Sequence, residues 1–119
     1  MLEGKQPHIY GDGEQQRDFV YVDDVVDANI KAIDRGDGKA FNIGTAKRTS
    51  VNRMFELLQG ILQFKWEAEH RTSRPGEVQN ISLECSKAEK GLKWTSQVDL
   101  EEGLKRTVEF FSRLTKANA

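Results

Sequence analysis

The stretch "IYGDGEQQRDFVYVDDVV", residues 9–26, combines a glycine turn, one arginine, alternating apolar residues and adjacent carboxylates. Residues 9–10 are predicted to be extended. A turn is predicted over residues 11–15, because its two glycines permit positive φ. The following "DFVYV", residues 18–22, alternates between two faces as a short strand does. The stretch therefore predicts a strand that runs directly into the next element.

That next element is predicted to be a helix capped by Asp23 or Asp24. A carboxylate at this position accepts hydrogen bonds from free N–H groups and suits the helix dipole. The glycines of "RGDGK", residues 35–39, end the helix. Its apolar residues recur with the helical period: Val22, Val25, Val26, Ile30 and Ile33.

The rest of the chain alternates strands and helices, which indicates a mixed α/β fold in one domain, residues 1–119. The predicted elements are a buried strand over 40–44, a helix capped by Ser50, a strand around 65–70, a loop over 71–78, a short helix near 86–92 and a last helix opened by Asp99 with Glu102 three residues on.

Composition restricts the function classes. With 18 basic and 19 acidic residues the net charge is −1, which argues against a general nucleic-acid-binding protein. No apolar run is long enough to span a membrane, and "MLEGKQPHIY" does not read as a signal peptide. A single cysteine, Cys85, excludes an internal disulfide and cysteine-based metal clusters. A cytoplasmic location and no membrane partner are expected.

Two arginines are candidates for phosphate recognition. Arg17 follows the glycine turn, and Arg74 precedes Pro75–Gly76 in a polar loop. Guanidinium groups bind phosphate oxygens in a bidentate manner, although either residue can equally be a solvated surface arginine. The segment "GDGEQQRD" has neither the lysine of a phosphate-binding loop nor the spacing of a dinucleotide-binding loop.

Other chemically active side chains give weaker signals. Asp23 and Asp24 could form an acid–base pair, but their place at a helix start favours capping. His8 and His70 are too few, and too poorly accompanied, to predict a metal site, and both are expected at the surface. Cys85 has no histidine near it in sequence and is expected to be a small packing residue.

The two tryptophans, Trp66 and Trp94, are expected in the core or at its edge, although tryptophan can also stack on a base. From composition and spacing alone, the catalytic signal is weak.

The chain as a whole resembles the C-terminal, substrate-binding part of the NAD-dependent epimerase/dehydratase family, the extended short-chain dehydrogenases that act on nucleotide sugars. The resemblance lies in four blocks that occur in family order: "IYGDGEQQRDFVYVDDVVDANIKAI" (9–33), "FNIGTAKRTSVNRMFELL" (41–58), "RPGEVQNISLECSKAEKGLKW" (74–94) and "VDLEEGLKRTVEFF" (98–111).

The resemblance implies roles for four residues. Arg17 and Arg74 would contact the diphosphate of a nucleotide sugar from opposite sides. Glu77 would accept hydrogen bonds from the ribose hydroxyls. Tyr10 stands where the family builds the wall of the base and sugar pocket. A UDP- or dTDP-sugar is the implied ligand, and no catalytic residue or metal ligand is implied.

The resemblance also implies that the helix over 23–34 and the strand over 40–44 pack against a dinucleotide-binding lobe. Their apolar faces would then need cover, so self-association or a partner that carries the Rossmann portion is expected. Ala46 departs from the family, which commonly has glycine there. If its φ is positive, alanine costs about 1 kcal/mol.

The catalytic motifs of the family do not occur in this sequence. A glycine-rich dinucleotide fingerprint is missing, and so is a tyrosine followed four residues later by lysine. The chain alone is therefore predicted to bind no cofactor and to be inactive, with NAD bound elsewhere in the parent enzyme. Two alternatives stay open: a non-catalytic binding or interaction module, and a truncated remnant without a ligand. Neither the sugar nor epimerisation against dehydration is specified.

Overall fold

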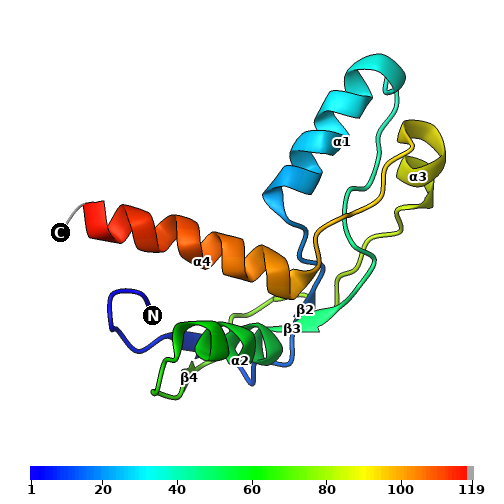
Figure 1. The fold of residues 1–119 in the computed structure, drawn as a ribbon. Coiled ribbons are helices and arrows are strands. Elements are labelled where there is room, and N and C mark those ends of the chain that lie inside the picture. Colours follow the sequence, from blue (N-terminus) through cyan, green and yellow to red (C-terminus); the bar gives the residue numbers. More distant parts are fainter. Residues whose placement is uncertain (118–119) are drawn as a thin grey trace.

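The computed structural model describes residues 1–117, with side chains through residue 115. Helices and short strands alternate along the chain, as Figure 1 shows. In chain order the elements are β1 (His8–Tyr10), β2 (Gln16–Arg17), α1 (Val22–Arg35), β3 (Thr49–Ser50), α2 (Val51–Leu62), β4 (Glu69–Arg71), α3 (Ser86–Leu92) and α4 (Leu100–Ala117).

The strands form two small sheets. β1 and β4 pair in parallel, with Ile9 opposite His70. β2 and β3 pair antiparallel, with Arg17 opposite Thr49. The mixed α/β class predicted from the sequence is confirmed.

The molecule is open in shape. α4 lies over α2 beside the β1–β4 sheet, while α1 and α3 pack together and project from the other side of β2 and β3 (Figure 1). The radius of gyration is 16.8 Å, whereas a compact domain of this length has about 13–14 Å. Much of the surface of each helix therefore faces solvent. No helix within residues 1–117 is long and apolar enough to cross a membrane.

The buried core lies between α1 and α3. It consists of Ala28, Ala88, Leu92 and Trp94, and Phe41 packs against it. Trp94 is 1% exposed, and its indole N–H donates to the Asp24 carbonyl over 2.9 Å. Trp94 is thus a core residue, as predicted. Trp66 is 54% exposed and does not pack against this core, so the prediction is wrong for Trp66.

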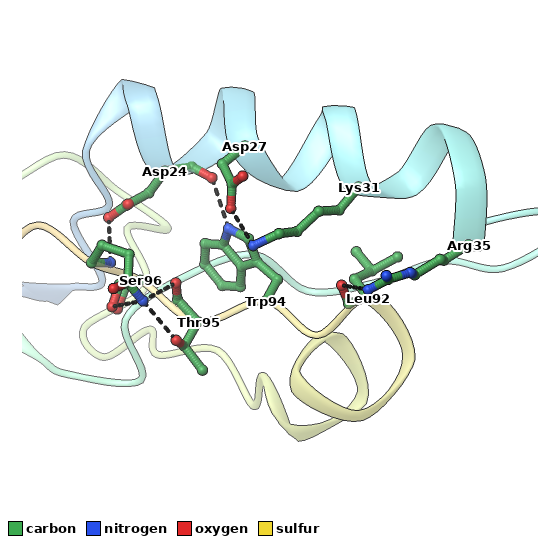
Figure 2. Close-up of polar contacts among 9 residues, drawn as sticks. Asp24, Asp27, Lys31, Arg35, Leu92, Trp94, Thr95 and Ser96 are labelled. Atoms are coloured by element: carbon green, nitrogen blue, oxygen red, sulfur yellow. Dashed lines mark hydrogen bonds and ion pairs between the residues drawn. The ribbon is translucent and has the colours of Figure 1, made fainter.

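The start of α1 differs from the prediction. Tyr21 occupies the N-cap position and its side chain caps nothing, so the predicted capping by Asp23 or Asp24 is wrong. Asp24 is buried, and one carboxylate oxygen accepts hydrogen bonds from the backbone N–H groups of Gln97 and Val98, both at 3.0 Å. Figure 2 shows this carboxylate directed away from the helix toward the segment after Trp94.

Because Asp24 and Ala28 face inward, the apolar stripe of α1 faces outward. The exposed members of this stripe are Val22, Val26, Ile30 and Ile33. The expectation that this helix presents an uncovered apolar face is therefore confirmed.

Two predicted strands, 18–22 and 40–44, are wrong. Among residues 1–117 neither segment lies in a sheet, because no neighbouring strand supplies a hydrogen-bonding partner. The strand predicted around 65–70 is found over Glu69–Arg71. Phe41, within the second of the two segments, packs against the core without any strand pairing.

Local signals predicted three helices well. Ser50 accepts a hydrogen bond from the Arg53 N–H and caps α2, and α3 spans the expected residues. The Asp99 carboxylate accepts from the Glu102 N–H over 2.9 Å at the start of α4. The Glu102 side chain does not complete a capping box, because it pairs with Arg106 at 2.7 Å.

Asp18 joins three separate segments of the chain. Its carboxylate accepts hydrogen bonds from the Thr45 N–H and hydroxyl at 2.8 and 2.6 Å, from the Ala46 N–H at 2.9 Å and from the Leu83 N–H at 3.3 Å. Ala46 has a φ of 59°, the strained conformation that makes alanine unfavourable there. The Asp18 side chain thus accepts hydrogen bonds from backbone N–H groups that would otherwise need acceptors in a sheet.

These contacts make the stability of the fold depend on pH. Burial raises the pKa of Asp18, but the hydrogen bonds from Thr45, Leu83 and Ala46 outweigh it and hold the pKa below its usual value. A carboxyl with a lowered folded-state pKa stabilises the protein above its unfolded pKa of about 3.9, and this stabilisation is lost as pH falls through the folded value.

We expect Asp18→Asn to lower the free energy of unfolding at pH 7 by about 1–3 kcal/mol, because an amide leaves N–H donors without acceptors. Urea denaturation at pH 7 and pH 3 measures the effect, and the difference from the wild type should shrink at pH 3. Asp37→Asn is the control, since Asp37 is exposed in the loop after α1. Equal losses at both pH values would contradict the role of the Asp18 charge.

Candidate functional site

A tight turn presents two of the predicted site residues. The Glu77 N–H donates to the Arg74 carbonyl over 3.4 Å, and Gly76 has a φ of 77°. Proline at the second position and a positive-φ glycine at the third are the pattern of a type II turn. The sequence "RPGE" thus places Arg74 and Glu77 at the two corners of one turn.

Backbone hydrogen bonds bring the segment after this turn alongside β2. The Gln16 N–H donates to the Gln79 carbonyl over 2.7 Å, and the Ile81 N–H donates to the Gln16 carbonyl over 3.0 Å. An isolated parallel bridge joins Gln16 and Asn80. Arg17, the next residue of β2, therefore lies near Glu77.

Arg17 and Glu77 form an ion pair, with Nη2 3.3 Å from Oε1. Their side chains are 26% and 27% exposed. The other terminal nitrogen of Arg17 donates to the carbonyls of Gln16 and Gln79 at 2.9 and 3.5 Å. Arg17 is therefore held in one orientation and is not a freely solvated surface arginine.

Tyr10 and Arg74 form a second pair. The Arg74 guanidinium carbon lies 4.1 Å from the centre of the Tyr10 ring, within the range of a cation–π contact. Hydrogen bonding and charge from Arg74, and more weakly from Arg71, lower the pKa of the Tyr10 hydroxyl. Within residues 1–115, Arg74 has no carboxylate in ion-pair range. Its charge is therefore available to an anion.

The glycine loop between Tyr10 and Arg17 is anchored to α2. The Asn52 N–H donates to the Gly13 carbonyl over 3.0 Å, and its side-chain amide donates to the Asp12 carbonyl over 2.9 Å. A Cβ on Gly13 would overlap the Asn52 side chain. The buried Gln15 amide donates to the Tyr10 carbonyl over 2.9 Å. The loop is a rigid connection between the two pairs.

The other candidates do not form a site. Within the described residues, no three His, Cys, Asp or Glu side chains are grouped to hold a metal ion. His8 and His70 are exposed, as expected. Cys85 is half-buried, and burial raises the pKa of its thiol, which disfavours the reactive thiolate. It lines a hollow of about 550 Å³ beside Trp94 that includes none of Tyr10, Arg17, Arg74 and Glu77.

The glycine loop does not have the arrangement of a dinucleotide-binding loop. The glycine loop leads into strand β2, whereas a dinucleotide-binding loop leads into the N-terminus of a helix that contacts the pyrophosphate. The long helix α1 begins directly after Tyr21, without a preceding glycine loop.

Sequence inspection missed the residues that support the site. Asn52 and Gln15 belong to no sequence motif. Asn52 is, however, a polar residue at the second position of a helix, and Gln15 is a polar residue inside a glycine turn. Side chains at both kinds of position can hold a loop. Arg71 was also missed. It lies opposite Tyr10 in the β1–β4 sheet, three residues before Arg74.

The structure is a mixed α/β lobe in which Arg17 pairs with Glu77 at one corner of a turn and Arg74 stands at the other corner, over the Tyr10 ring. Residues 1–107 match the family model described as GDP-mannose 4,6 dehydratase. The chain therefore belongs to the family of NAD-dependent nucleotide-sugar epimerases and dehydratases.

Solved structures and curated proteins of this family resemble the chain closely. The UDP-glucose 4-epimerase of Thermotoga maritima, solved with UDP-glucose, is 48% identical with a TM-score of 0.94, over 97% of this chain and 37% of that one. The UDP-glucuronic acid 4-epimerase of Bacillus cereus, a Y149F mutant solved with a fluorinated UDP-sugar and NAD, is 30% identical with a TM-score of 0.87, over 95% and 37%.

Among curated proteins, the UDP-glucose 4-epimerase of Mycolicibacterium smegmatis is 39% identical over 112 residues, covering 93% of this chain and 36% of the relative. The chain thus spans little more than a third of the length of the relatives it matches.

The "RPGE" turn can be tested through Gly76. A Cβ at Gly76 meets no atom within 4 Å, so Gly76→Ala changes only the backbone preference. We expect a loss of about 1 kcal/mol of unfolding free energy, because an L side chain disfavours positive φ. Gly60→Ala, also in open space but inside α2, should instead stabilise by about 0.5–1 kcal/mol. Denaturant unfolding compares the two, and a Gly76→Ala variant as stable as the wild type would rule out the turn.

Proposed function

We propose that this chain is the nucleotide-sugar-binding, C-terminal part of an NAD-dependent epimerase or dehydratase, with a UDP- or dTDP-sugar as its ligand. Arg17 and Arg74 bind the diphosphate, Glu77 accepts hydrogen bonds from the ribose hydroxyls, and Tyr10 forms a wall of the pocket. The observation that carries the proposal is the Arg17–Glu77 ion pair beside the turn that presents Arg74.

The chemistry of these groups suits a diphosphate. A guanidinium is planar and permanently charged, and its fork matches two phosphate oxygens. One arginine comes from β2 and the other from the turn at 74–77, so a ligand between them is held from two chain segments. The Tyr10 ring beneath Arg74 limits the directions in which that guanidinium can move.

Glu77 serves two purposes in this arrangement. Without ligand, its carboxylate neutralises Arg17 in a half-buried position, where an unpaired charge would be costly. When a diphosphate takes over Arg17, the carboxylate is free to accept from a pair of ribose hydroxyls. The ion pair thus prepares both groups for the ligand, which lowers the entropy lost on binding.

The reaction belongs to the longer parent protein. There, a nucleotide sugar is interconverted through transient hydride transfer to NAD, and NAD is held by the part of the parent outside this chain. The residues of this chain bind and orient the substrate and perform no chemical step. Solved relatives are named as complexes with both NAD and a UDP-sugar, which supports NAD as the cofactor of the parent.

Ligand binding is tested by titrating the chain with UDP-glucose. We expect Arg17→Ala and Arg74→Ala each to weaken binding by roughly 10- to 100-fold, because each removes a charge-assisted contact. Isothermal titration calorimetry at fixed, low salt measures the dissociation constants. Arg53→Ala is the matched control, since Arg53 is an exposed arginine of α2 paired with Glu56.

Equal affinity in all three arginine variants would exclude the proposed diphosphate site. Binding of NAD by the chain alone would contradict the assignment of the cofactor to the rest of the parent protein.

We also propose that the apolar stripe of α1 is covered in the parent by the dinucleotide-binding portion, and by self-association in the isolated chain. The stripe is continuous with a second apolar area, because Val22 and Phe110 line one hollow between α1 and α4. Exposed apolar surface of this kind promotes association.

Light scattering at high protein concentration is expected to give a mass above the 13.5 kDa of one chain. The double variant Val26→Lys with Ile30→Lys should shift the population toward the monomer, because two charges on the stripe oppose its burial. Asn29→Lys, at an exposed polar position of the same helix, is the control. A wild-type monomer at high concentration would refute self-association.

A further inference from the structure

The exposed face of the β1–β4 sheet carries four side chains that the proposed function does not fully use. In this parallel pair His8 lies opposite Glu69, and Tyr10 lies opposite Arg71. Side chains two residues apart on a strand share a face, so all four point the same way, whereas Ile9 between them is buried.

Three of these side chains form a closed triangle. Nη2 of Arg71 lies 2.9 Å from Nε2 of His8 and 3.1 Å from a carboxylate oxygen of Glu69. The same Glu69 oxygen lies 2.7 Å from Nδ1 of His8. A guanidinium can only donate, so Nε2 must carry no proton and Nδ1 must donate to Glu69. The imidazole fixes the Arg71 side chain from one side while Glu69 fixes it from the other.

The main chain at Arg71 is fixed as well. The Gly11 N–H donates to the Arg71 carbonyl over 2.8 Å, and the ring of His70 contacts the Gly11 carbonyl at 2.8 Å. Arg71 is therefore held by its backbone next to the glycine loop and by its side chain next to Tyr10. It is only 44% exposed despite its place on a two-stranded sheet.

We propose that Arg71 is a positioning residue for the nucleotide-sugar site: held by His8 and Glu69, its guanidinium fixes the Tyr10 side chain in the orientation that stacks on Arg74. The ligand-binding part of this inference rests on the proposed function. The Tyr10 hydroxyl lies under the influence of both arginines, which agrees with this geometry. Arginine suits the role because one nitrogen, Nη2, makes both contacts and leaves the rest of the guanidinium free on the strand position opposite Tyr10, whereas a lysine ammonium is a single point.

The ionisation of Tyr10 reports on this arrangement without any ligand. The chain has two tyrosines, so Tyr21→Phe leaves Tyr10 as the single tyrosine. In that background, absorbance titration of tyrosinate gives its midpoint directly. We expect Arg71→Gln to raise the midpoint, Arg71→Lys to restore it only in part, and His8→Ala to raise it by a smaller amount. Arg53→Gln, which removes an arginine from α2, should leave it unchanged.

The same variants are then titrated with UDP-glucose. Arg71→Gln should weaken binding by roughly fivefold, the effect of losing one supporting hydrogen bond. An unchanged tyrosinate midpoint in Arg71→Gln overturns the proposal. If that variant does not fold, His8→Ala decides, and an unchanged midpoint there has the same meaning. Absence of binding of UDP-sugars and dTDP-sugars alike by the wild type refutes the proposed function, whereas a midpoint raised by Arg71→Gln still supports Arg71 as the residue that positions Tyr10.

Discussion

The Asp18 carboxylate is the constraint on which the rest of this structure depends. It accepts four hydrogen bonds from three residues that lie 27 to 65 positions away in the chain. These contacts fix the direction in which the chain leaves β2, and therefore where α1 begins relative to the site at Arg17. Each sheet has only two strands, so the chain has few hydrogen bonds between strands. The charged Asp18 side chain therefore connects chain segments that a larger sheet would connect through backbone hydrogen bonds.

Asp24 has a similar role in the first turn of α1. Its carboxylate holds the backbone at Gln97 and Val98, and its carbonyl accepts from Trp94, so the segment between α3 and α4 is fixed to α1 (Figure 2). These hydrogen bonds of Asp24 determine which face of α1 points toward the protein. With Asp24 and Ala28 facing inward, the apolar stripe is left outside, although a helix normally buries that face. The orientation of α1 is thus set by buried polar contacts.

Features that depend on neighbouring residues were predictable from the sequence, and features that depend on distant ones were not. The cap at Ser50 is a local hydrogen bond and was predicted correctly. Asp24 was misread as a cap because its partners lie more than seventy positions away. The segment 18–22 alternates like a strand but has no partner strand. The contact of Arg17 with Glu77 spans sixty positions, and only the resemblance to a family placed both residues on one ligand.

In the candidate site, as around Asp18, charged side chains are fixed by contacts with other parts of the chain. Both arginines that would contact the ligand are also held within the protein: Arg17 by the backbone carbonyls of Gln16 and Gln79, and Arg74 by the ring of Tyr10. Because loss of side-chain freedom opposes binding, groups fixed before the ligand arrives bind it more tightly than free ones. In the function proposed above, the half-buried Arg17–Glu77 pair and the Arg74 guanidinium stacked on Tyr10 are therefore groups oriented in advance to hold a ligand.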